Sequence, residues 1–368
     1  MTKTLAELQT LCSQLEIAVP PQRRPAKEPY LHALRDHFWE RENPGRPLPE
    51  QVEPMLLGDW NDLDDAEAAL IESDQSGWCV QEKHDGVRVL VHVTPEGVRI
   101  TGRTVSEVTF RLGEFQANLP HLTTGFENLV GTVLDGELVC PAAVIDTGGT
   151  VTTHPLQAAV ATLATTPENA KAIQDRHGCH LRFVAFDVLR FQGIDTTVEP
   201  LRERLTALEA AYLAAENPHL GLAETHAADK ALFHELLIAE GKEGSVWKRL
   251  DGRYDPGKRV RHWLKRKKGI EVEAVVTGFK PGTAGRGNAH LVGAVEFSTI
   301  DPNGIAKPIA WVSNWTDEQR ERMTRRDGDT VTLDPAMLGR KALVAGHDIA
   351  GRSGRYRHAR IIKWLDAA

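Results

Sequence analysis

The first 44 residues alternate apolar and polar positions with the period of an α-helix. Thr4 and Glu7 have the spacing of a capping box, which is typical of a helix start. The apolar positions that follow recur every three or four residues and share one face: Leu5, Leu8, Leu11, Cys12 and Leu15. After a linker rich in proline and basic residues, a second amphipathic helix is predicted over 30–38, with Pro29 tolerated in its first turn. This pattern predicts a helical hairpin in residues 1–44.

Four prolines between 44 and 54 separate this hairpin from a longer segment in which both strand and helix periods occur. Alternating or continuous apolar runs predict strands at 77–81, 89–93, 98–100, 132–139 and 181–189. Helical periods predict helices at 155–164, 167–177, 199–215 and 227–240, after an acidic surface helix within 59–74. We therefore expect one α+β domain over residues 45–268.

From residue 269 onward the pattern changes to short strands separated by turns. Apolar alternation predicts strands at 272–279, 291–300, 308–312, 330–333 and 341–345. Five strands in about 100 residues are typical of a small β-barrel, whose core is expected to hold Trp263, Trp311, Trp315 and Trp364. The glycine-rich segment 282–287 precedes a strand, so it does not fit a dinucleotide-binding turn, which opens a helix. The sequence also lacks GxxxxGK[ST], which excludes a P-loop.

The composition is that of a globular protein, since 41% of the 368 residues are hydrophobic. The segment Met1–Cys12 lacks the apolar centre of a signal peptide, and no run approaches the ~20 apolar residues of a membrane span. We therefore expect a cytoplasmic protein. The four cysteines are far apart and form no CxxC pair, which favours reduced thiols over disulfides or a zinc site: Cys12, Cys79, Cys140 and Cys179.

The net charge is −7, but the charges are unevenly distributed along the chain. Residues 41–75 are strongly acidic, whereas residues 248–268 and 340–363 are strongly basic. Two concentrated basic stretches on an acidic background indicate a defined path for a polyanion rather than a uniformly adhesive surface.

A lysine followed by an acid and a glycine lies between two predicted strands, in the run Lys83-His84-Asp85-Gly86-Val87-Arg88. Because strands flank it and the glycine keeps the backbone open, its amine is expected to face a ligand rather than bulk water. Glu137 interrupts another buried strand. A strand core rejects an unpaired charge, so Glu137 is expected to face a polar cavity.

Five short motifs occur in the order and with the spacing found in ATP-dependent DNA ligases, which the chain resembles over residues 47–268. They are Lys83-x-Asp-Gly-x-Arg, Asp135-Gly-Glu, Phe186-Asp-x-Leu, Glu243-Gly-x-x-x-Lys and Trp263-x-Lys-x-Lys. The resemblance implies an α+β, ATP-grasp-like nucleotidyltransferase domain with antiparallel sheets over 45–268, followed by an OB-fold β-barrel over 269–368. The hairpin before them is similar to a SAP-type DNA-binding module, or it packs on the next domain as a purely structural element.

The resemblance also assigns roles to side chains. It implies that Lys83 attacks the α-phosphate of ATP and becomes bonded to AMP. Seven residues are expected to bind the nucleotide: Arg88, Glu137, Phe186, Val246, Lys248, Lys265 and Lys267. Of these, Arg88 and Glu137 would hold the ribose. Phe186 and Val246 would enclose adenine, and Lys265 and Lys267 would grip the α-phosphate. Glu243 would orient Mg²⁺, or Mn²⁺ in its place, through water.

Further cations have counterparts in the family, although here the motifs are less complete. Arg103 stands where the family has an arginine that meets the 5′-phosphate of a nick, but Gly102 and Val105 replace the serine and glycine of that motif. The Arg-x-Asp-Lys that closes most family members is not kept at the end of this chain. We therefore expect a residue of the C-terminal basic stretch to orient pyrophosphate: Arg357, Arg360 or Lys363.

These features favour an ATP-dependent DNA ligase that acts as a monomer and seals nicks between a 5′-phosphate and a 3′-hydroxyl in duplex DNA. RNA ligases and GTP-using capping enzymes share the Lys-x-Asp-Gly motif and stay as alternatives. An NAD-dependent ligase is disfavoured because the cysteines of its zinc module are missing. A non-catalytic DNA-binding relative is a further alternative, against which the joint retention of five charged motif residues argues: Lys83, Glu137, Glu243, Lys265 and Lys267.

Overall fold

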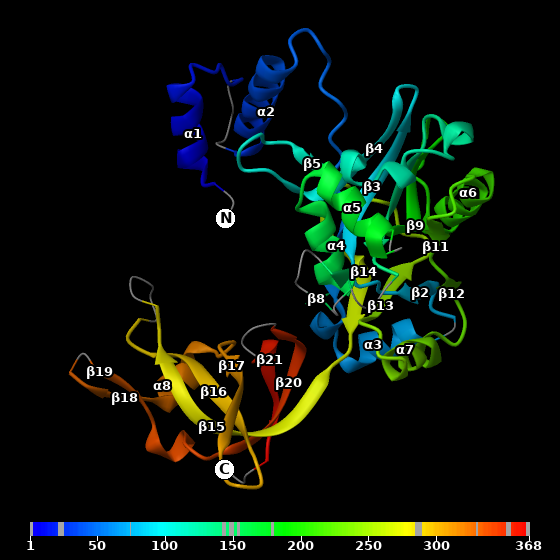
Figure 1. Ribbon diagram of the computed structural model, residues 1–368. Coiled ribbons are helices and arrows are strands. Elements are labelled where there is room, and N and C mark those ends of the chain that lie inside the picture. Colours follow the sequence, from blue (N-terminus) through cyan, green and yellow to red (C-terminus); the bar gives the residue numbers. More distant parts are fainter. Residues whose placement is uncertain are drawn as a thin grey trace. The chain divides into compact units, whose positions relative to one another are not determined.

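In the computed structural model the chain forms two compact units, residues 1–266 and 267–368. The structure describes residues 3–20, 26–73, 75–141, 145–146, 151–152, 155–177, 180–283, 289–328, 330–350 and 355–365. Figure 1 shows helices and sheets in the first unit and a mainly β architecture in the second. None of the described helices is both long enough and apolar enough to span a membrane.

The predicted helical hairpin is present as α1 (Leu5–Gln14) and α2 (Glu28–Glu42). The Thr4 side chain accepts from the Glu7 N–H, and the Glu7 carboxylate accepts from the Thr4 N–H, so the capping box is formed. α2 extends beyond the predicted range at both ends, and Pro29 lies in its first turn, where its missing N–H has no partner to lose. The two helices share a buried cluster that includes Leu8, Cys12 and Leu34.

The rest of the first unit is built on two large sheets (Figure 1). The five-stranded sheet has the order β1 (Leu56–Asp59), β14 (Arg259–Lys267), β13 (Gly244–Arg249), β2 (Trp78–Glu82) and β12 (Thr225–His226). The seven-stranded sheet has the order β10 (Ile194–Asp195), β9 (Arg182–Phe191), β6 (Val133–Val139), β3 (Val87–Thr94), β4 (Gly97–Val105) and β5 (Leu112–Glu114), and β11 (Leu220–Leu222) pairs with β9. Most described pairs are antiparallel, and β1–β14 and β11–β9 are parallel. A small hairpin joins β7 (Ile145–Asp146) and β8 (Val151–Thr152).

Helices cover both sheets at the predicted places in the sequence. The seven-stranded sheet contacts α4 (Pro155–Leu163) and α6 (Leu201–Ala214), and α5 (Pro167–His177) packs beside α4. The five-stranded sheet is covered by α3 (Asp65–Glu72) and α7 (Lys230–Ala239), which share an apolar cluster with its strands. A further cluster joins strands of the two sheets to each other and includes Cys79, Leu90, Leu189 and Trp263. The two sheets are therefore held face to face by a common core.

The second unit contains a five-stranded antiparallel sheet with the order β17 (Ala306–Val312), β16 (Val292–Ile300), β15 (Ile270–Pro281), β20 (Lys341–Ala350) and β21 (Arg355–Trp364). β17 and β21, at the two ends of this order, contact each other as the edges of a barrel do. Val295, Phe297 and Val344 lie in its core. A short helix, α8 (Asp317–Met323), follows β17.

One predicted strand lies outside the five-stranded sheet. The predicted strand at 330–333 exists as β19 (Thr330–Leu333), but it pairs with β18 (Thr324–Asp327) in a separate hairpin. The fifth strand of the sheet is instead β21. Apolar alternation identifies a strand but not its hydrogen-bonding partner, which explains the error. The glycine-rich segment 282–287 lies mostly outside the described residues.

Candidate functional site

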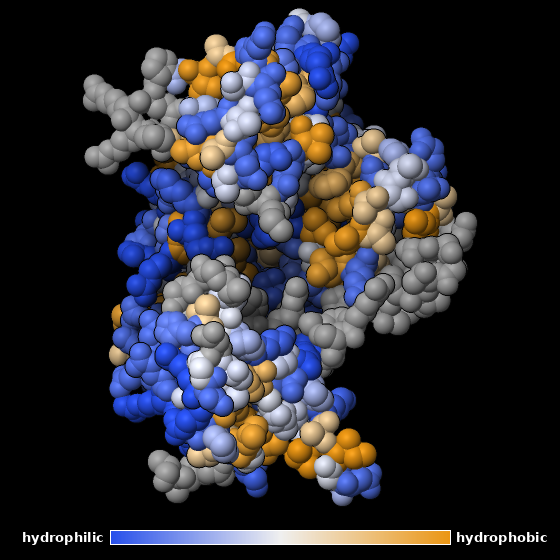
Figure 2. Space-filling model, turned by 90° about the vertical axis from the view of Figure 1, so that its left-hand side faces the viewer, coloured by the Kyte–Doolittle hydropathy of each residue, from blue (hydrophilic) through white to orange (hydrophobic). Residues whose placement is uncertain are grey.

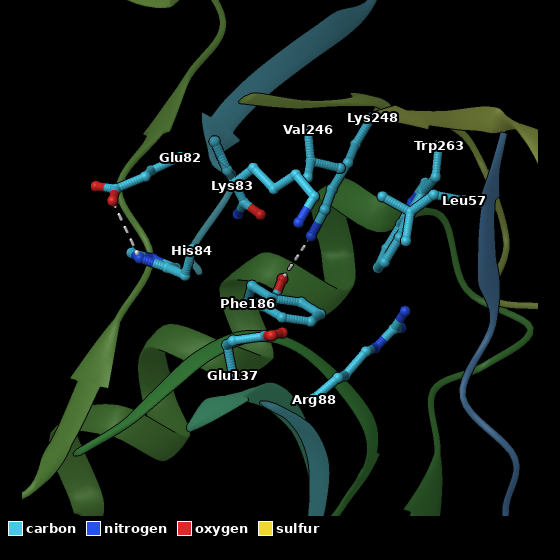
Figure 3. A pocket seen from close by; sticks show the side chains of 11 residues that line it. Leu57, Glu82, Lys83, His84, Arg88, Glu137, Phe186, Val246, Lys248 and Trp263 are labelled. Atoms are coloured by element: carbon cyan, nitrogen blue, oxygen red, sulfur yellow. Dashed lines mark hydrogen bonds and ion pairs between the residues drawn. The ribbon is translucent and has the colours of Figure 1, made fainter. Parts of the chain in front are cut away.

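A cavity lies between the two sheets of the first unit (Figure 3). Its lining mixes charged and apolar side chains: Leu57, Gln81, Glu82, Lys83, His84, Arg88, Glu137, Phe186, Val246, Lys248 and Trp263. This set contains six residues that the sequence analysis assigns to the site, namely Lys83, Arg88, Glu137, Phe186, Val246 and Lys248, although they are spread from residue 83 to residue 248. They meet because β3, β6 and β9 of one sheet face β13 of the other across the cavity.

Lys83 lies in the short connection between β2 and β3. Its backbone N–H donates to the carbonyl oxygen of Gly244 at 2.9 Å, which ties the connection to the five-stranded sheet. Its Nζ lies 2.6 Å from Oε2 of Glu243, and both side chains are mostly buried. A side chain at Gly86 would not fit, because its Cβ would lie 2.1 Å from the carbonyl oxygen of Leu138. The glycine thus lets the lysine-bearing turn approach β6 closely.

A bidentate ion pair holds Arg88 beside the cavity. Its Nε and Nη2 donate to the two carboxylate oxygens of Asp135 at 2.9 and 2.6 Å, and its Nη1 donates to the carbonyl oxygen of Met55 at 2.7 Å. The Tyr254 hydroxyl donates to Asp135 at 2.7 Å and accepts from the Met55 N–H at 3.1 Å. Burial disfavours the charged form of Arg88, yet Asp135 raises its pKa above the ordinary value. Four chain segments therefore meet in one buried polar network.

Glu137 follows Asp135 by two positions on β6, so its side chain leaves the same face of the strand. It pairs in register with Arg88 of β3 and lines the cavity, as the sequence predicts. Burial raises the pKa of Glu137 to about 7, although Lys83 and Arg88 act in the opposite direction. Near neutral pH this carboxyl group therefore exchanges between a protonated donor and an ionised acceptor.

Lys248 on β13 is buried, with an exposed fraction of 1%. Its Nζ lies 4.5 Å from the ring centroid of Phe186 and 3.9 Å from that of Trp263, and it donates to the carbonyl oxygen of Phe186 at 3.1 Å. Burial lowers the pKa of Lys248 to about 8, while Asp187 favours the charged form. Figure 3 shows the side chains of Lys83 and Lys248 extending into the same part of the cavity. Two amines thus converge where a polyanion could bind.

Phe186 and Val246 come from different sheets. Phe186 belongs to β9 and Val246 to β13, and both line the cavity with partly exposed side chains. Two apolar surfaces on opposite walls suit a flat aromatic ring, because such a ring gains contact on both faces.

The other cations predicted for the site do not line this cavity. On β14, Lys265 forms an ion pair with Asp59 of β1, with Nζ 3.2 Å from Oδ2. Lys267 is the last residue of β14. Arg103 is exposed on β4. The remaining three candidates, Arg357, Arg360 and Lys363, lie on β21 of the second unit, and the Arg357 side chain lies outside the described part of the chain.

Three residues of the site escaped prediction from the sequence. Trp263 was expected in the barrel core, but it belongs to the first unit and lines the cavity. Asp135 belongs to the Asp135-Gly-Glu motif but has no role in the sequence-based prediction, whereas in the structure it is the ion-pair partner of Arg88. Tyr254 carries no sequence signal, because it reaches Asp135 from 119 positions away.

The acidic side chains near the cavity offer few ligands to a metal ion. Among the residues that the structure describes, no three His, Cys, Asp or Glu side chains come together as ligands. Mg²⁺ needs only one or two protein carboxylates when substrate phosphates and waters complete its shell. The carboxylate of Glu243, 2.6 Å from the Lys83 amine, therefore fits a metal ion that a nucleotide brings with it.

Comparison with known proteins gives consistent matches. The family model described as the ATP dependent DNA ligase domain matches residues 54–267, which include all five motifs. A DNA ligase of Haloarcula marismortui is 31% identical over 289 residues, which cover 74% of this chain and 49% of the relative. A probable DNA ligase of Kineococcus radiotolerans is 32% identical over 339 residues, or 88% of this chain and 60% of the relative. The chain thus spans about half to three fifths of the length of these relatives.

Solved structures match the fold. A structure from a study of DNA binding by Lig E DNA ligases has a TM-score of 0.51 and 16% identity, and covers 86% of this chain and 100% of that chain. A second structure, Pmar-Lig_PreS3, has a TM-score of 0.54 and 18% identity, with coverage of 98% and 83%. The predicted fold class, an α+β nucleotidyltransferase domain with antiparallel sheets followed by an OB-fold barrel, is confirmed.

Proposed function

This chain belongs to the family of ATP-dependent DNA ligases, and from that membership we propose that it seals nicks in duplex DNA through a lysine–AMP intermediate. The observation that carries the proposal is the position of Lys83. Its side chain lines a cavity together with Phe186, Val246 and Glu137, which offer an apolar slot and a carboxyl group to a nucleoside.

In the first reaction the Lys83 amine attacks the α-phosphorus of ATP. A phosphorus–nitrogen bond forms, and the bond to pyrophosphate breaks. In the second reaction a 5′-phosphate oxygen of the nick attacks the phosphorus of AMP and releases the lysine. In the third reaction the 3′-hydroxyl attacks the adenylylated 5′-phosphate, so that a phosphodiester bond forms and AMP leaves. The first attack requires a neutral amine, so the Lys83 ammonium group must lose a proton before the bond to phosphorus forms.

The nucleotide-binding residues act in groups. Phe186 and Val246 enclose adenine, and Glu137 accepts a hydrogen bond from a ribose hydroxyl. Arg88 supports the ribose side of the site. Most of its N–H donors already bond Asp135 and the carbonyl oxygen of Met55.

The phosphate end of the site is cationic. Lys248, Lys265 and Lys267 neutralise phosphate oxygens, as basic residues do in phosphoryl-transfer enzymes. Glu243 and the phosphates would hold Mg²⁺, or Mn²⁺ in its place, which supplies further neutralisation of the triphosphate when bound.

The remaining assignments concern DNA and domain organisation. Residues 1–44 form a helical module similar to a SAP module, residues 45–268 the adenylyltransferase domain, and residues 269–368 the OB-fold domain. Arg103 meets the 5′-phosphate of the nick, and residues of the C-terminal basic strand orient pyrophosphate: Arg357, Arg360 and Lys363. The protein acts as a monomer in the cytoplasm.

A label-transfer panel tests this function. Protein is incubated with α-labelled ATP, GTP or NAD and Mg²⁺, and then with nicked duplexes whose strands are DNA, RNA or one of each. We expect covalent label from ATP alone and sealing of the DNA nick. Lys83→Ala should take up no label, whereas Lys242→Ala, which alters a nearby, more exposed lysine, should behave like the wild type.

Other results of this panel would contradict individual parts of the proposed function. Unlabelled wild-type protein would contradict the adenylylation step, and labelled Lys83→Ala would contradict the choice of nucleophile. Label transfer with sealing of RNA nicks only would identify an RNA ligase.

A further inference from the structure

Arg103 lies in a stretch of β4 where regular strand pairing is interrupted. β3 pairs with β4 only as far as Gly102. On the other side, β5 pairs with Thr101 and then with Val105, and the register shifts between these two pairs. The backbone at Arg103 is therefore flanked by the pair Val89–Gly102 before it and by the pair Val105–Leu112 after it.

The turn that makes this pair is tight and strained. The Ser106 N–H donates to the carbonyl oxygen of Arg111 at 2.8 Å, and the Phe110 N–H donates to the carbonyl oxygen of Ser106 at 3.0 Å. Phe110 has a φ of 56°, in the left-handed region that is unfavourable for a residue with a bulky side chain. Such a conformation persists only where surrounding contacts hold it.

Besides its own hydrogen bonds to Ser106, the turn is held by contacts with α1 and α2. The Phe110 ring is 5% exposed and joins the buried cluster of the two helices, where it stacks on Phe38 with 5.9 Å between the ring centroids. Next to it, Arg111 donates to Glu42 at 2.6 Å and lies 4.9 Å from the ring centroid of Trp39. The Phe110 turn is thus anchored to the helical pair by an aromatic stack, an ion pair and a cation–π contact.

The linker after α2 also bonds to the strand that follows the Phe110 turn. The Leu112 N–H of β5 donates to Oε1 of Gln51 at 3.0 Å, so the strand that pairs beside Arg103 is bonded to the linker. Figure 2 views the side of the molecule that carries α1 and α2 and shows hydrophobic residues among hydrophilic ones on this face. Phe110 packs among apolar side chains that belong to both helices.

We propose that the helical pair positions Arg103 through the Phe110 turn, so that it acts on nick sealing by holding this arginine in place and not only by touching DNA. Phe110 is a positioning residue, since its ring is buried in the cluster of the two helices. The proposal rests on the proposed function, because it assumes that Arg103 meets the 5′-phosphate of the nick.

A double-mutant cycle tests the coupling. Phe110→Ala, Arg103→Ala and the double variant are compared for sealing of a nick that already carries the 5′-adenylate, and for binding of nicks with a 5′-phosphate or a 5′-hydroxyl. We expect Phe110→Ala to slow sealing at saturating DNA by about tenfold, the scale of one lost contact to a charged group. It should also reduce the preference for the 5′-phosphate. The double variant should be no slower than Arg103→Ala, because both changes remove the same contact.

Three controls keep the outcome interpretable. Lys83 labelling by ATP should stay at the wild-type level in Phe110→Ala, which shows that the catalytic domain is folded. Val108→Ala alters an exposed residue of the same turn and should seal normally. Phe110→Gly removes the ring but favours the left-handed backbone, so it should lose sealing as Phe110→Ala does.

Several results would overturn the proposal. Additive losses in the double variant would show that Phe110 and Arg103 act separately. Normal sealing by Phe110→Gly would show that the turn keeps Arg103 in place without the helices, and a change in DNA affinity alone would leave the helical pair a simple DNA-binding module. Failure of the wild type to take up label would instead contradict the proposed function itself.

Discussion

The amine of Lys83 and the carboxylate of Glu243 lie 2.6 Å apart, although 160 positions separate the two residues in the chain. The pair is mostly buried, with side chains 22% and 11% exposed, so it is a stronger contact than a surface ion pair. Attack on ATP requires a neutral amine, which cannot sustain this ion pair. In the proposed reaction this ion pair therefore has to be given up, and a metal ion that accompanies the phosphates would offer the carboxylate another partner.

The first prediction follows from this pair. Lys83→Arg should keep the ion pair with Glu243 and the wild-type unfolding temperature, because a guanidinium group donates to a carboxylate as an ammonium group does. It should nevertheless abolish label transfer from ATP, because a guanidinium group does not lose its proton in proteins. Gel detection of the labelled protein and a thermal melt measure both properties. A labelled Lys83→Arg protein would show that another residue is the nucleophile.

The second prediction concerns the pH dependence of ATP binding. With a pKa of about 7, Glu137 is ionised in about a tenth of molecules at pH 6 and in about nine tenths at pH 8. If the ionised form accepts from the ribose, the affinity for ATP should rise several-fold across this range. Glu137→Gln should bind ATP more weakly at pH 8 and with a flatter pH profile. Because both proteins are titrated with the same nucleotide, the titration of ATP itself cancels in the comparison.

The third prediction uses the same group to test stability. Burial raises the pKa of Glu137 above its ordinary value of 4.5, so the folded protein binds its proton more tightly than the unfolded chain does. This carboxyl group therefore destabilises the fold progressively as the pH rises from about 4.5 to about 7. Glu137→Gln should raise the free energy of unfolding above that of the wild type. This gain should be larger at pH 8 than at pH 5, by on the order of 2 kcal/mol. Urea unfolding at the two pH values measures this difference, and Glu209→Gln, on the surface of α6, should show none.

These residues also show what the sequence could and could not predict. Lys83, Glu137, Phe186 and Val246 were found because each sits in a short motif with its own spacing. The partner of Arg88 was not found, since hydrogen bonds between β3, β6 and the Tyr254 loop depend on how distant segments pack.

The same limit applies to sheets. Residues 330–333 have the alternation of a strand, yet the pattern carries no information on whether the strand joins the barrel or the β18–β19 hairpin. Local periodicity thus predicts elements, and the tertiary packing that selects their partners has no local signal.

The fourth prediction concerns the buried pair of Arg88 and Asp135. Asp135→Ala should destabilise the protein by about 3–5 kcal/mol, because it leaves a buried guanidinium without its counter-charge. The double change Arg88→Met with Asp135→Leu should recover much of that loss, since it removes both charges. The matched control is Asp251→Ala, which breaks the exposed pair with Arg249 and should cost less than about 1 kcal/mol. Equal losses in Asp135→Ala and Asp251→Ala would contradict the burial argument.

The last prediction concerns the basic residues of β21, where the motif that closes most family members is not kept. In the first reaction pyrophosphate leaves, and cations held beyond the α-phosphate favour its departure. In the third reaction AMP leaves and no pyrophosphate is present. If Arg357, Arg360 and Lys363 orient pyrophosphate, replacing all three by alanine should slow lysine–AMP formation by at least about a hundredfold. Sealing of a nick that already carries the 5′-adenylate should be largely spared.

If these three cations instead bind the DNA backbone, the same variant gives the reverse pattern. Lysine–AMP formation would be normal, and sealing of the adenylylated nick would be slow but partly restored at low salt, because phosphate contacts strengthen as counterions are removed. A control that removes three exposed charges elsewhere in the second unit, Lys307, Arg322 and Arg326, separates a local role from a general loss of positive charge. Equal loss of the first and third reactions in the β21 variant, with a normal control, would contradict a role confined to pyrophosphate and assign these cations to both reactions.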